Sequence, residues 1–386
     1  MIGFHDIRVI VGSTTPLMIH GPQVQVLEAR LTKLLEEKVE EVQKMLYALA
    51  KPLCAKASET VLPPLWAINH TIPLIDPEKI YLWCPSCCPE ALCPQWVEKR
   101  WAYLASGQWK ITSKGNTMPM LSIHKHGPDK LRTVIDLWKC NKNTQKLSTP
   151  LPDIDRILRR VAKGCYQSII DGQDAYEQIH IMPEHVERSV VTTPDGNIIS
   201  TVIQIGDCNM PATYQVLMNH LFCNYIGRWI DVYLDDIVVY SDTLEENIEH
   251  VRRVLDILKW EWLYLSESKV QFLCKELKIL GHVVDDEGIQ MDPAKVDQVV
   301  KWKIPTNRDL LHGLIGSAGY LVDDIYRVWI PLGVLLAVTG DTVPFHWTET
   351  EQCTFEKVKH HVQACATHHR MPFVTRSVEQ ASTHSE

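Results

Sequence analysis

Apolar residues recur every three or four positions in two long stretches of the chain, which is the spacing of an amphipathic helix. In residues 24–50, the apolar stripe consists of Leu35, Val39, Val42, Leu46 and Leu49. This stripe lasts barely two heptads, so it predicts a solvent-exposed linker helix and no stable coiled coil. The second stripe consists of Leu244, Ile248, Val251, Leu255, Leu258 and Trp262. Thr243 and Glu246 have the spacing of a capping box, which predicts the start of this second helix.

Short apolar runs separated by turn residues predict strands. Three pairs of runs have the spacing of hairpins, namely 189–193 with 198–205, 230–234 with 237–240, and 278–284 with 289–291. The sequences Pro-Asp-Gly-Asn at 194–197 and Asp-Asp-Glu-Gly at 285–288 favour tight turns. Pro211 is expected to open another helix that runs to about residue 226. Strands packed against segregated helices predict an α+β fold.

The segment between the first helix and the first strands is rich in proline. Prolines stand at positions 52, 63, 64, 73, 77, 85, 89 and 94. Because proline restricts its own φ and lacks an amide hydrogen, this density predicts an extended, irregular connector. No internal repeat is visible in the sequence.

The composition is that of a globular protein. Of the 386 residues, 45% are apolar and 22% are charged, which argues against wholesale disorder and predicts about two to three folded units. No run approaches the roughly 18 apolar residues of a membrane span, and residues 1–20 lack the pattern of an export signal. The 12 cysteines are therefore expected to be reduced thiols. We expect a soluble intracellular protein with no membrane partner.

The net charge of −8 is distributed unevenly. Residues 90–170 carry 14 Lys and Arg against 6 Asp and Glu, whereas residues 171–386 carry 17 against 32. A basic block beside an acidic block can hold a polyanion over a cluster of carboxylates. The alternative is that charge varies along a solvated surface without a partner, and charge alone does not separate these two interpretations.

Three aspartates stand where apolar strands end. Asp235 and Asp236 lie between two apolar runs, and Asp171 ends the run 166–170 immediately before Gly172. Adjacent carboxylates repel each other and aspartate is a poor strand residue, so a divalent cation such as Mg²⁺ would relieve the repulsion. A glycine beside a carboxylate also permits close approach of the backbone. The alternative is that each aspartate is an ordinary turn residue.

Several motifs occur in an order that resembles a known family. The motifs are Asp-x-x-x-Ala-Tyr at 171–176, Asn-Met-Pro-Ala-Thr-Tyr-Gln at 209–215, Tyr-Leu-Asp-Asp at 233–236, Lys-Ile-Leu-Gly-His at 278–282, Trp-x-x-Pro-x-Asn at 302–307 and Phe-x-Trp-Thr at 345–348. Over about residues 60–362, this series is similar to the reverse transcriptase region of the Pol polyprotein of gypsy-type LTR retrotransposons. The resemblance implies the right-hand polymerase fold, with fingers, palm and thumb, behind an N-terminal helical and extended region.

The same resemblance implies a division of the chain into domains. The implied domains are an N-terminal helix and Pro-rich linker (1–94), the reverse transcriptase fingers and palm (95–285), a thumb or connection (286–362) and an irregular tail (363–386). The fingers would take residues 95–164 and 183–205, and the palm would take residues 165–182 and 206–285.

The three aspartates match the catalytic carboxylates of the family. The resemblance implies that Asp171 and Asp235 hold two Mg²⁺ ions, with Mn²⁺ as an alternative, and that Asp236 assists them as a secondary metal-binding carboxylate. One ion would lower the pKa of a primer 3′-hydroxyl, and the other would hold the nucleotide triphosphate and steady the leaving pyrophosphate.

Five further residues match substrate-binding positions of the family. Lys125 and Arg132 correspond to residues that neutralise the triphosphate, and a flexible lysine and a forked arginine suit that role. Tyr176 corresponds to the steric gate that excludes a 2′-hydroxyl. Gln215 corresponds to a contact with the incoming nucleotide, and Lys269 to a proton donor for pyrophosphate. Without the resemblance, Lys125 and Arg132 would be two solvated cations, Tyr176 a core aromatic and Gln215 an ordinary helical glutamine.

The implied function is that of an RNA-directed DNA polymerase, which transfers nucleotides from dNTPs to a primer 3′-hydroxyl by two-metal catalysis. The implied partners are an RNA or DNA template-primer, dNTPs and other Pol or Gag products of the same element. The implied location is intracellular, in the cytoplasm or in a particle. Two alternatives are a catalytically decayed retroelement remnant that at most binds nucleic acid, and a two-metal nuclease.

Departures from the family pattern motivate the decayed alternative. Trp138 stands where the pattern places arginine, and residues 204–207 read Gln-Ile-Gly-Asp where Pro-Phe-Gly-Leu is common. The spacing of the cysteines at 84, 87, 88 and 93 also invites a zinc interpretation. However, the nearest histidines are His70 and His124, which are too distant in the sequence for a zinc knuckle. Single-base loss of arginine codons explains the excess of both Cys and Trp, so we interpret the cysteine cluster as decay.

Overall fold

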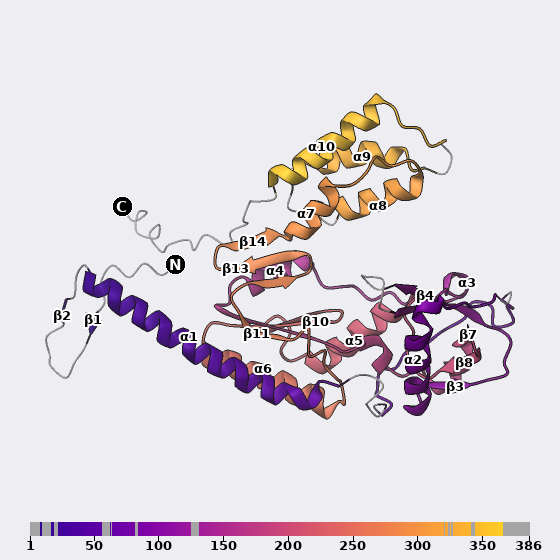
Figure 1. The fold of residues 1–386 in the computed structure, drawn as a ribbon, viewed down its shortest axis with the longest axis horizontal. Coiled ribbons are helices and arrows are strands. Elements are labelled where there is room, and N and C mark those ends of the chain that lie inside the picture. Colours follow the sequence, from indigo (N-terminus) through magenta and orange to yellow (C-terminus); the bar gives the residue numbers. More distant parts are fainter. Residues whose placement is uncertain are drawn as a thin grey trace, which may run out of the picture. The chain divides into compact units, whose positions relative to one another are not determined.

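A computed structural model describes residues 8–9, 17–18, 22–55, 62, 64–81, 84–124, 131–319, 321–322, 325, 327–340 and 344–365. The chain divides into two compact units (Figure 1). Unit 1 comprises Met1–Asp153 and Tyr166–Cys274, and unit 2 comprises Ile154–Cys165 and Lys275–Glu386. Sheets and segregated helices occur in both units, which confirms the predicted α+β class. The assignment of fingers, palm and thumb to particular ranges stays a prediction.

The first sheet of unit 1 has four antiparallel strands in the order β11-β6-β10-β9. The strands are β6 (Tyr166–Asp171), β9 (Ile230–Tyr233), β10 (Asp236–Ser241) and β11 (Gln271–Cys274). The helices that contact these strands are α1 (Pro22–Ala50), α5 (Met210–Phe222) and α6 (Leu244–Trp260). The hairpin β9–β10 confirms the predicted pair of strands on either side of the Asp-Asp turn.

The predicted start of α6 is also confirmed. The Thr243 side chain accepts a hydrogen bond from the backbone amide of Glu246, and the Glu246 carboxylate accepts one from the backbone amide of Thr243. These reciprocal bonds satisfy donors that the first turn of a helix otherwise leaves unpaired.

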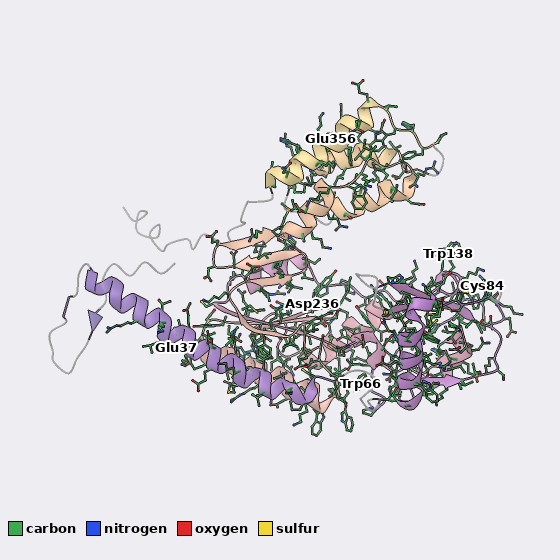
Figure 2. All side chains as sticks on the ribbon, in the orientation of Figure 1. Glu37, Trp66, Cys84, Trp138, Asp236 and Glu356 are labelled. Atoms are coloured by element: carbon green, nitrogen blue, oxygen red, sulfur yellow. The ribbon has the colours of Figure 1, made fainter. Side chains whose placement is uncertain are left out.

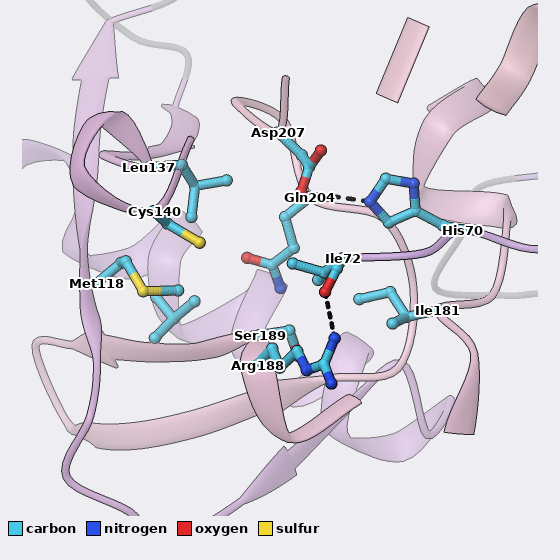
Figure 3. A pocket seen from close by; sticks show the side chains of 11 residues that line it. His70, Ile72, Met118, Leu137, Cys140, Ile181, Arg188, Ser189, Gln204 and Asp207 are labelled. Atoms are coloured by element: carbon cyan, nitrogen blue, oxygen red, sulfur yellow. Dashed lines mark hydrogen bonds and ion pairs between the residues drawn. The ribbon is translucent and has the colours of Figure 1, made fainter. Parts of the chain in front are cut away.

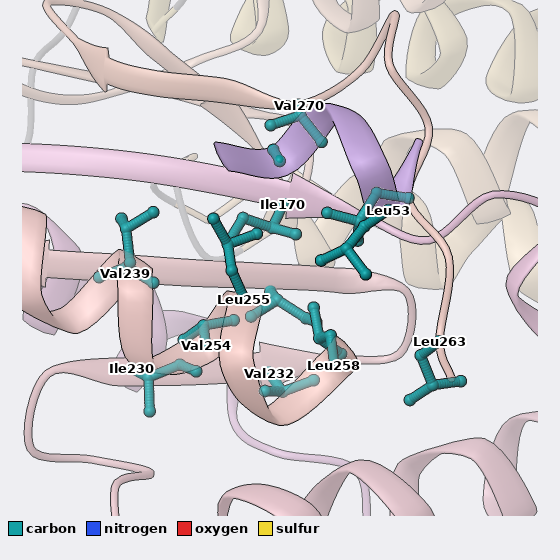
Figure 4. Packing of buried hydrophobic residues seen from close by; sticks show 14 of the residues in the cluster. Leu53, Ile170, Ile230, Val232, Val239, Val254, Leu255, Leu258, Leu263 and Val270 are labelled. Carbon is teal, nitrogen blue, oxygen red and sulfur yellow. The ribbon is translucent and has the colours of Figure 1, made fainter. Parts of the chain in front are cut away.

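One hydrophobic cluster joins the first sheet to α6. Ile170 of β6, Val232 of β9 and Val239 of β10 lie in this cluster with Val254 and Leu255 of α6 (Figure 4). Each of these side chains is at most 4% exposed. Full burial of a side chain of this size contributes about 1.5–3 kcal/mol, so this layer is a main source of the stability of unit 1.

The prediction of an exposed linker helix over residues 24–50 is wrong for its C-terminal half. Leu46 and Ala50 of α1 are 0% and 1% exposed and belong to the same hydrophobic cluster as the first sheet. The Lys38 ammonium also donates a hydrogen bond of 2.7 Å to the Glu245 carboxylate at the start of α6. The apolar period of a helix predicts one buried face, but it does not identify the distant element that covers this face.

The second sheet of unit 1 has five strands in the order β3-β8-β7-β4-β5. The strands are β3 (Trp109–Ile111), β4 (Met118–His124), β5 (Leu131–Ile135), β7 (Val190–Thr193) and β8 (Gly196–Ser200). The hairpin β7–β8 confirms the turn predicted at 194–197, but the strand predicted to reach residue 205 ends at Ser200. Beyond Ser200, the amides of Thr201 and Ile203 donate to the carbonyls of Gln108 and Ile179, so the backbone leaves the ladder.

Further, mostly short helices complete the described part of unit 1. The remaining helices of unit 1 are η1 (Lys51–Leu53), η3 (Glu90–Leu92), α2 (Cys93–Ala105), α3 (Trp138–Lys142), η4 (Ala175–Gln178) and η5 (Pro183–Arg188). Tyr103 of α2 packs on the sheet, with its ring centroid 4.5 Å from that of Trp109 on β3. The Pro-rich connector is irregular, as predicted, and its His70 exchanges backbone hydrogen bonds with His180 and Met182.

Unit 2 combines a small antiparallel sheet with helices. Its elements are α4 (Ile154–Val161), β12 (Leu277–Ile279), β13 (His282–Asp285), β14 (Gly288–Met291), α7 (Pro293–Val300), α8 (Arg308–Gly319), α9 (Trp329–Ala337) and α10 (Glu349–Cys365). Leu314 of α8, Leu335 of α9 and Phe355 of α10 are 0% exposed in a shared core. Two further short strands, β1 (Arg8–Val9) and β2 (Leu17–Met18), pair with each other.

The single strand predicted over 278–284 is wrong. Leu280 and Gly281 have φ values of 48° and 67°, which end β12 and turn the chain back into β13. A left-handed backbone favours glycine, so Gly281 is a turn signal. Sequence reasoning missed this signal because Leu280 makes the segment look like a continuous apolar run. The second predicted turn is confirmed, because β13 and β14 pair across it with Asp285 opposite Gly288. Within the described residues, we find no helix with the length and apolar character needed to cross a membrane.

Candidate active site

The three predicted catalytic aspartates meet at one end of the first sheet. Asp171, the last residue of β6, stands directly opposite Asp236, the first residue of β10. Residues paired in this way have Cα atoms about 4.5–5.5 Å apart. Asp235 is the next residue along the chain and belongs to the turn between β9 and β10. The register of the sheet therefore assembles carboxylates that are distant in the sequence, and Asp236 is labelled in Figure 2.

Gln215 of α5 braces the turn that carries Asp235. Its carbonyl oxygen Oε1 accepts a hydrogen bond of 2.8 Å from the amide of Leu234, and its Nε2 donates one of 3.1 Å to the carbonyl of Val232. Leu234 has a φ of 52°, a conformation that persists only where its surroundings enforce it. Gln215 is 0% exposed, so its side chain holds the hairpin in this structure, and the predicted contact with a nucleotide stays a prediction.

Gly172 permits the close approach that follows Asp171. A Cβ atom at this position would lie 2.8 Å from the Cβ of Ala175, which is closer than real Cβ atoms come to other carbons. The chain therefore turns directly from β6 into η4, which carries Tyr176. The Tyr176 ring packs edge-on against Tyr214, with centroids 5.2 Å apart.

The charge of the three aspartates is only partly balanced. Asp171 is 6% exposed, and the Lys269 ammonium lies 3.1 Å from both of its carboxylate oxygens. Burial raises the pKa of Asp171, although Lys269 acts in the opposite direction. Burial, followed by the charges of Asp235 and Asp171, raises the pKa of Asp236 to about 6. Burial and the same carboxylates also raise the pKa of the Tyr176 phenol, which places Tyr176 within their electrostatic reach.

The donor atoms at this site suit a hard divalent cation. Carboxylate oxygens are the ligands that Mg²⁺ prefers, and a cation would relieve the repulsion that raises the pKa of Asp236. Among the residues that the structure describes, no group of three or more His, Cys, Asp or Glu side chains is already arranged as a metal site. Lys269 donates to both oxygens of Asp171, and each oxygen keeps a further lone pair that can bind a cation. The residues thus fit the ion in charge and donor type.

Of two further predicted substrate residues, one lies on the second sheet and the other is outside the described residues. Arg132 is exposed on β5, opposite Ile123 of β4, and so belongs to the second sheet. Lys125 lies outside the described residues. By contrast, Lys269 contacts Asp171, and the pKa of Tyr176 is raised by burial and by the aspartates, while the roles of both residues stay predictions.

Sequence reasoning missed a second charged cluster, centred on Glu177. One carboxylate oxygen of Glu177 lies 3.6 Å from the Lys99 ammonium of α2, and the other accepts a hydrogen bond from the Tyr103 hydroxyl. Lys99 also donates a hydrogen bond of 2.8 Å to the Thr133 hydroxyl of β5. No motif marks these residues, because they come from three separate segments of the chain.

Sequence reasoning also missed a buried polar pocket. It is lined in part by Gln204 and Asp207, which belong to the segment that departs from the family pattern. His70 Nε2 lies 3.3 Å from the Asp207 carboxylate (Figure 3). The Nδ1 atom of His70 lies 3.0 Å from the Thr213 hydroxyl. The Arg188 guanidinium donates to the carbonyl of Ile72 beside them. The pocket has a volume of about 20 Å³, which is room for a water molecule. Asp207 is thus paired with His70 inside unit 1.

Trp138 is exposed, as expected for a surface position that the family fills with arginine. Its side chain is 62% exposed at the start of α3, and the Lys142 ammonium lies 3.6 Å above its ring (Figure 2). The nearby cysteines are free thiols. The sulfur atoms of Cys88 and Cys93 lie 3.6 and 3.5 Å from the same carbonyl oxygen, that of Pro89.

Comparison with known proteins finds a matching family over part of the chain. Residues 123–284 match the family described as reverse transcriptase (RNA-dependent DNA polymerase). The Retrovirus-related Pol polyprotein from transposon 297 of Drosophila melanogaster is 34% identical over 205 residues, which are 53% of this chain and 19% of that protein. The Transposon Tf2-3 polyprotein of Schizosaccharomyces pombe is 27% identical over 259 residues, which are 66% of this chain and 19% of that protein. The chain thus spans about a fifth of the length of these relatives.

Solved structures show the same fold. The foamy viral protease-reverse transcriptase in complex with double-stranded DNA aligns with a TM-score of 0.67 and 18% identity, over 86% of this chain and 61% of that chain. The same kind of protein in complex with an RNA/DNA hybrid aligns with a TM-score of 0.66, over 92% of this chain and 49% of that chain. These matches confirm the right-hand polymerase fold, and the transposon relatives are consistent with a gypsy-type element. Residues 123–284 thus match the reverse transcriptase family, and the chain is similar to the reverse transcriptase region of LTR-retrotransposon Pol polyproteins.

Proposed function

We propose that this chain is an RNA-directed DNA polymerase that extends a primer 3′-hydroxyl with dNTPs on an RNA or DNA template. The observation that carries the proposal is the pairing of Asp171 with Asp236 at the end of the first sheet, with Asp235 in the adjoining turn. Three carboxylates facing one ammonium form a site with excess negative charge, which is typical of catalytic centres that bind cations. The reverse transcriptase match over residues 123–284 supports the same activity.

Asp171 and Asp235 would hold two Mg²⁺ ions, or Mn²⁺ in their place, with Asp236 as the secondary carboxylate. Ions of this kind lower the pKa of an attacking hydroxyl and stabilise the charge on a leaving pyrophosphate. The raised pKa of Asp236, caused first by burial and then by the charges of Asp235 and Asp171, supports this assignment, because a shared cation would stabilise the ionised carboxylate against both.

The chain's own side chains would select and hold the nucleotide. The half-buried ring of Tyr176, backed by Tyr214, would exclude a 2′-hydroxyl near the aspartates. Arg132, with Lys125, would neutralise the triphosphate. The Lys269 side chain is 57% exposed and its ammonium lies 3.1 Å from the Asp171 carboxylate, so it is suited to donate a proton to the departing pyrophosphate.

The partners that we propose are an RNA or DNA template-primer, dNTPs and other Pol or Gag products of the same element. Reverse transcriptases with this fold have been solved with double-stranded DNA and with an RNA/DNA hybrid, which supports the first of these partners. We also propose an intracellular location, in the cytoplasm or in a particle.

Primer extension on poly(rA)–oligo(dT) in the presence of Mg²⁺ tests this function. We expect extension by the chain as written and none by Asp235→Asn. Template binding without extension would instead support a catalytically decayed remnant. Cleavage of the template would identify a nuclease.

A further inference from the structure

Lys99 lies at the centre of the second charged cluster and contacts two elements at once. Its ammonium donates to Thr133 of β5 at 2.8 Å and lies 3.6 Å from Glu177 of η4. The same ammonium lies 4.7 Å from the centroid of the Tyr103 ring and 5.8 Å from that of Trp109. These two rings form an aromatic wall beside the ammonium, which favours its charge at a site that is largely shielded from water.

The two partners of Lys99 are sequence neighbours of two predicted substrate residues. Thr133 follows Arg132 on β5, and Glu177 follows Tyr176 in η4. Successive residues of a strand point to opposite faces of the sheet, so Thr133 is buried toward Lys99 while Arg132 is exposed. The Lys99 side chain thus connects two backbone segments. One is β5, which carries Arg132, proposed to neutralise the triphosphate, and the other is η4, which carries Tyr176, proposed to exclude a 2′-hydroxyl.

The connection to Glu177 is buried and well satisfied. The side chains of Glu177 and Lys99 are 11% and 24% exposed. The Tyr103 hydroxyl donates to the second oxygen of Glu177, and burial keeps the pKa of this phenol well above its usual value, so it stays a donor. A carboxylate held at both oxygens in a shielded site fixes the turn that carries it more firmly than an exposed ion pair would.

The other side of η4 is anchored independently. Gln178 donates a hydrogen bond of 3.0 Å to the carbonyl of Tyr264 and accepts one of 2.7 Å from the amide of Tyr264. Glu177, the residue before Gln178 in η4, is held at its side chain by Lys99 and Tyr103. A displacement of about 1 Å at a reacting or binding group can cost about a hundredfold in rate.

We propose that Lys99 is a positioning residue that, through Glu177 and Thr133, sets Tyr176 in register with Arg132 for binding of a deoxynucleoside triphosphate. The proposal rests on the proposed polymerase function. Under this proposal, Lys99 itself contacts neither the substrate nor the aspartates. Its removal should therefore disturb nucleotide binding and sugar selection more than template binding.

The test compares Lys99→Met, Lys99→Arg and a matched control, Lys114→Met. Lys114 also pairs with a glutamate of unit 1, at 2.5 Å from Glu187, but this pair is exposed and lies on different elements. For Lys99→Met we expect the KM for dTTP to rise about tenfold and the preference for dTTP over UTP to fall about tenfold, with a smaller change in kcat. Lys99→Arg should recover most of both quantities, and Lys114→Met should change neither. Template affinity should be the same for all variants.

Hydrogen–deuterium exchange provides a readout that does not depend on activity. For Lys99→Met we expect faster exchange in residues 131–135 and in residues 175–179 together, while the first sheet and the Lys114→Met variant keep the exchange of the unaltered chain. Unchanged exchange in either segment overturns the inference. Loss of thermal stability without a change in KM or in sugar preference, in a chain that extends primers, also overturns it. If the unaltered chain fails to extend primers, the proposed function fails, and coupled exchange of the two segments would still establish Lys99 as the link between them.

Discussion

Asp171 and Glu177 are separated by only one short turn in the sequence, yet their surroundings in unit 1 differ in kind. Asp171 shares the end of its sheet with Asp235 and Asp236, and Lys269 is the ammonium that faces them. Glu177 has each carboxylate oxygen matched by its own donor, Lys99 for one and Tyr103 for the other. Both carboxylates are buried, at 6% and 8% exposed, so burial does not separate them.

The difference lies in the balance of charge. Burying several like charges costs free energy, and binding of a cation or a proton offsets this cost. The raised pKa of Asp236 reflects it, because burial and the neighbouring carboxylates disfavour the ionised form. A single buried carboxylate with two donors has its charge compensated within the chain, so it stabilises one arrangement and needs no ligand. The first pattern is typical of a site for chemistry, and the second of a site that holds other residues in position. Four variants test this distinction, from the largest expected effect to the smallest.

Asp235→Asn should abolish primer extension, with a rate loss of at least about 10³-fold, or about 4 kcal/mol in the activation free energy. The reason is the loss of a metal-binding charge from a site that has no spare carboxylate of equal placement. Steady-state extension on poly(rA)–oligo(dT) measures this effect. Asp242→Asn, which neutralises an exposed aspartate at the far end of β10, should leave the rate unchanged. If Asp235→Asn retained more than a tenth of the extension rate, the three aspartates would not be the catalytic site.

Glu177→Ala should destabilise unit 1 by about 3 kcal/mol, because it leaves Lys99 and Tyr103 without the acceptor that they share. Urea denaturation monitored by circular dichroism measures the free energy of unfolding. The double variant Glu177→Leu with Lys99→Met should recover part of this loss, because it removes both charges from the cluster. A loss for Glu177→Ala no larger than that of an exposed ion pair would contradict the assignment of this cluster as a buried, compensated one.

Asp236→Asn should stabilise the protein in Mg²⁺-free buffer, even though it damages the proposed active site. The pKa of Asp236 is raised from 3.8 to about 6 in the folded state, so its ionisation opposes folding. The stability contributed by the protonated carboxyl is full below about pH 4 and is lost as the pH rises through about 6. The advantage of Asp236→Asn should therefore grow from near zero at pH 4 to about 1 kcal/mol at pH 8.

Melting temperatures of the unaltered chain and of Asp236→Asn across this pH range measure the effect. Asp242→Asn serves again as the matched variant, because Asp242 is exposed and a change there should show no comparable dependence on pH. An Asp236→Asn protein that is less stable than the unaltered chain at pH 8 would refute the excess of negative charge at this site.

Trp138→Arg should have the smallest effect, on binding of the template-primer. Replacing an exposed aromatic by a cation should strengthen binding about threefold and steepen its salt dependence by about one unit of slope. Fluorescence anisotropy between low and moderate salt measures both quantities. Trp101→Arg, at a position that is 65% exposed on α2, is the matched control. Equal gains in both variants would indicate a general effect of charge, and no gain in Trp138→Arg would show that Trp138 is a tolerated variant.

The sequence by itself determined the elements whose cause is local. The turn at 194–197, the capping box of Thr243 and Glu246, and the hairpin around Asp235 depend on residues within a few positions of one another, and all three are present. The fold class and the family could also be predicted, because the motifs of the family are short and occur in a fixed order. Local chemistry and ordered motifs are properties of the chain before it packs.

Only the tertiary structure decided which distant residues meet. The burial of Leu46 against the first sheet and the role of Gln215 as a brace depend on packing between segments far apart in the chain. The compensation of Glu177 likewise depends on where α2 comes to lie, because Lys99 and Tyr103 carry no signal in the sequence that points to a carboxylate. An apolar period or a charged residue specifies what kind of partner it needs, whereas the partner's identity follows from the assembled core.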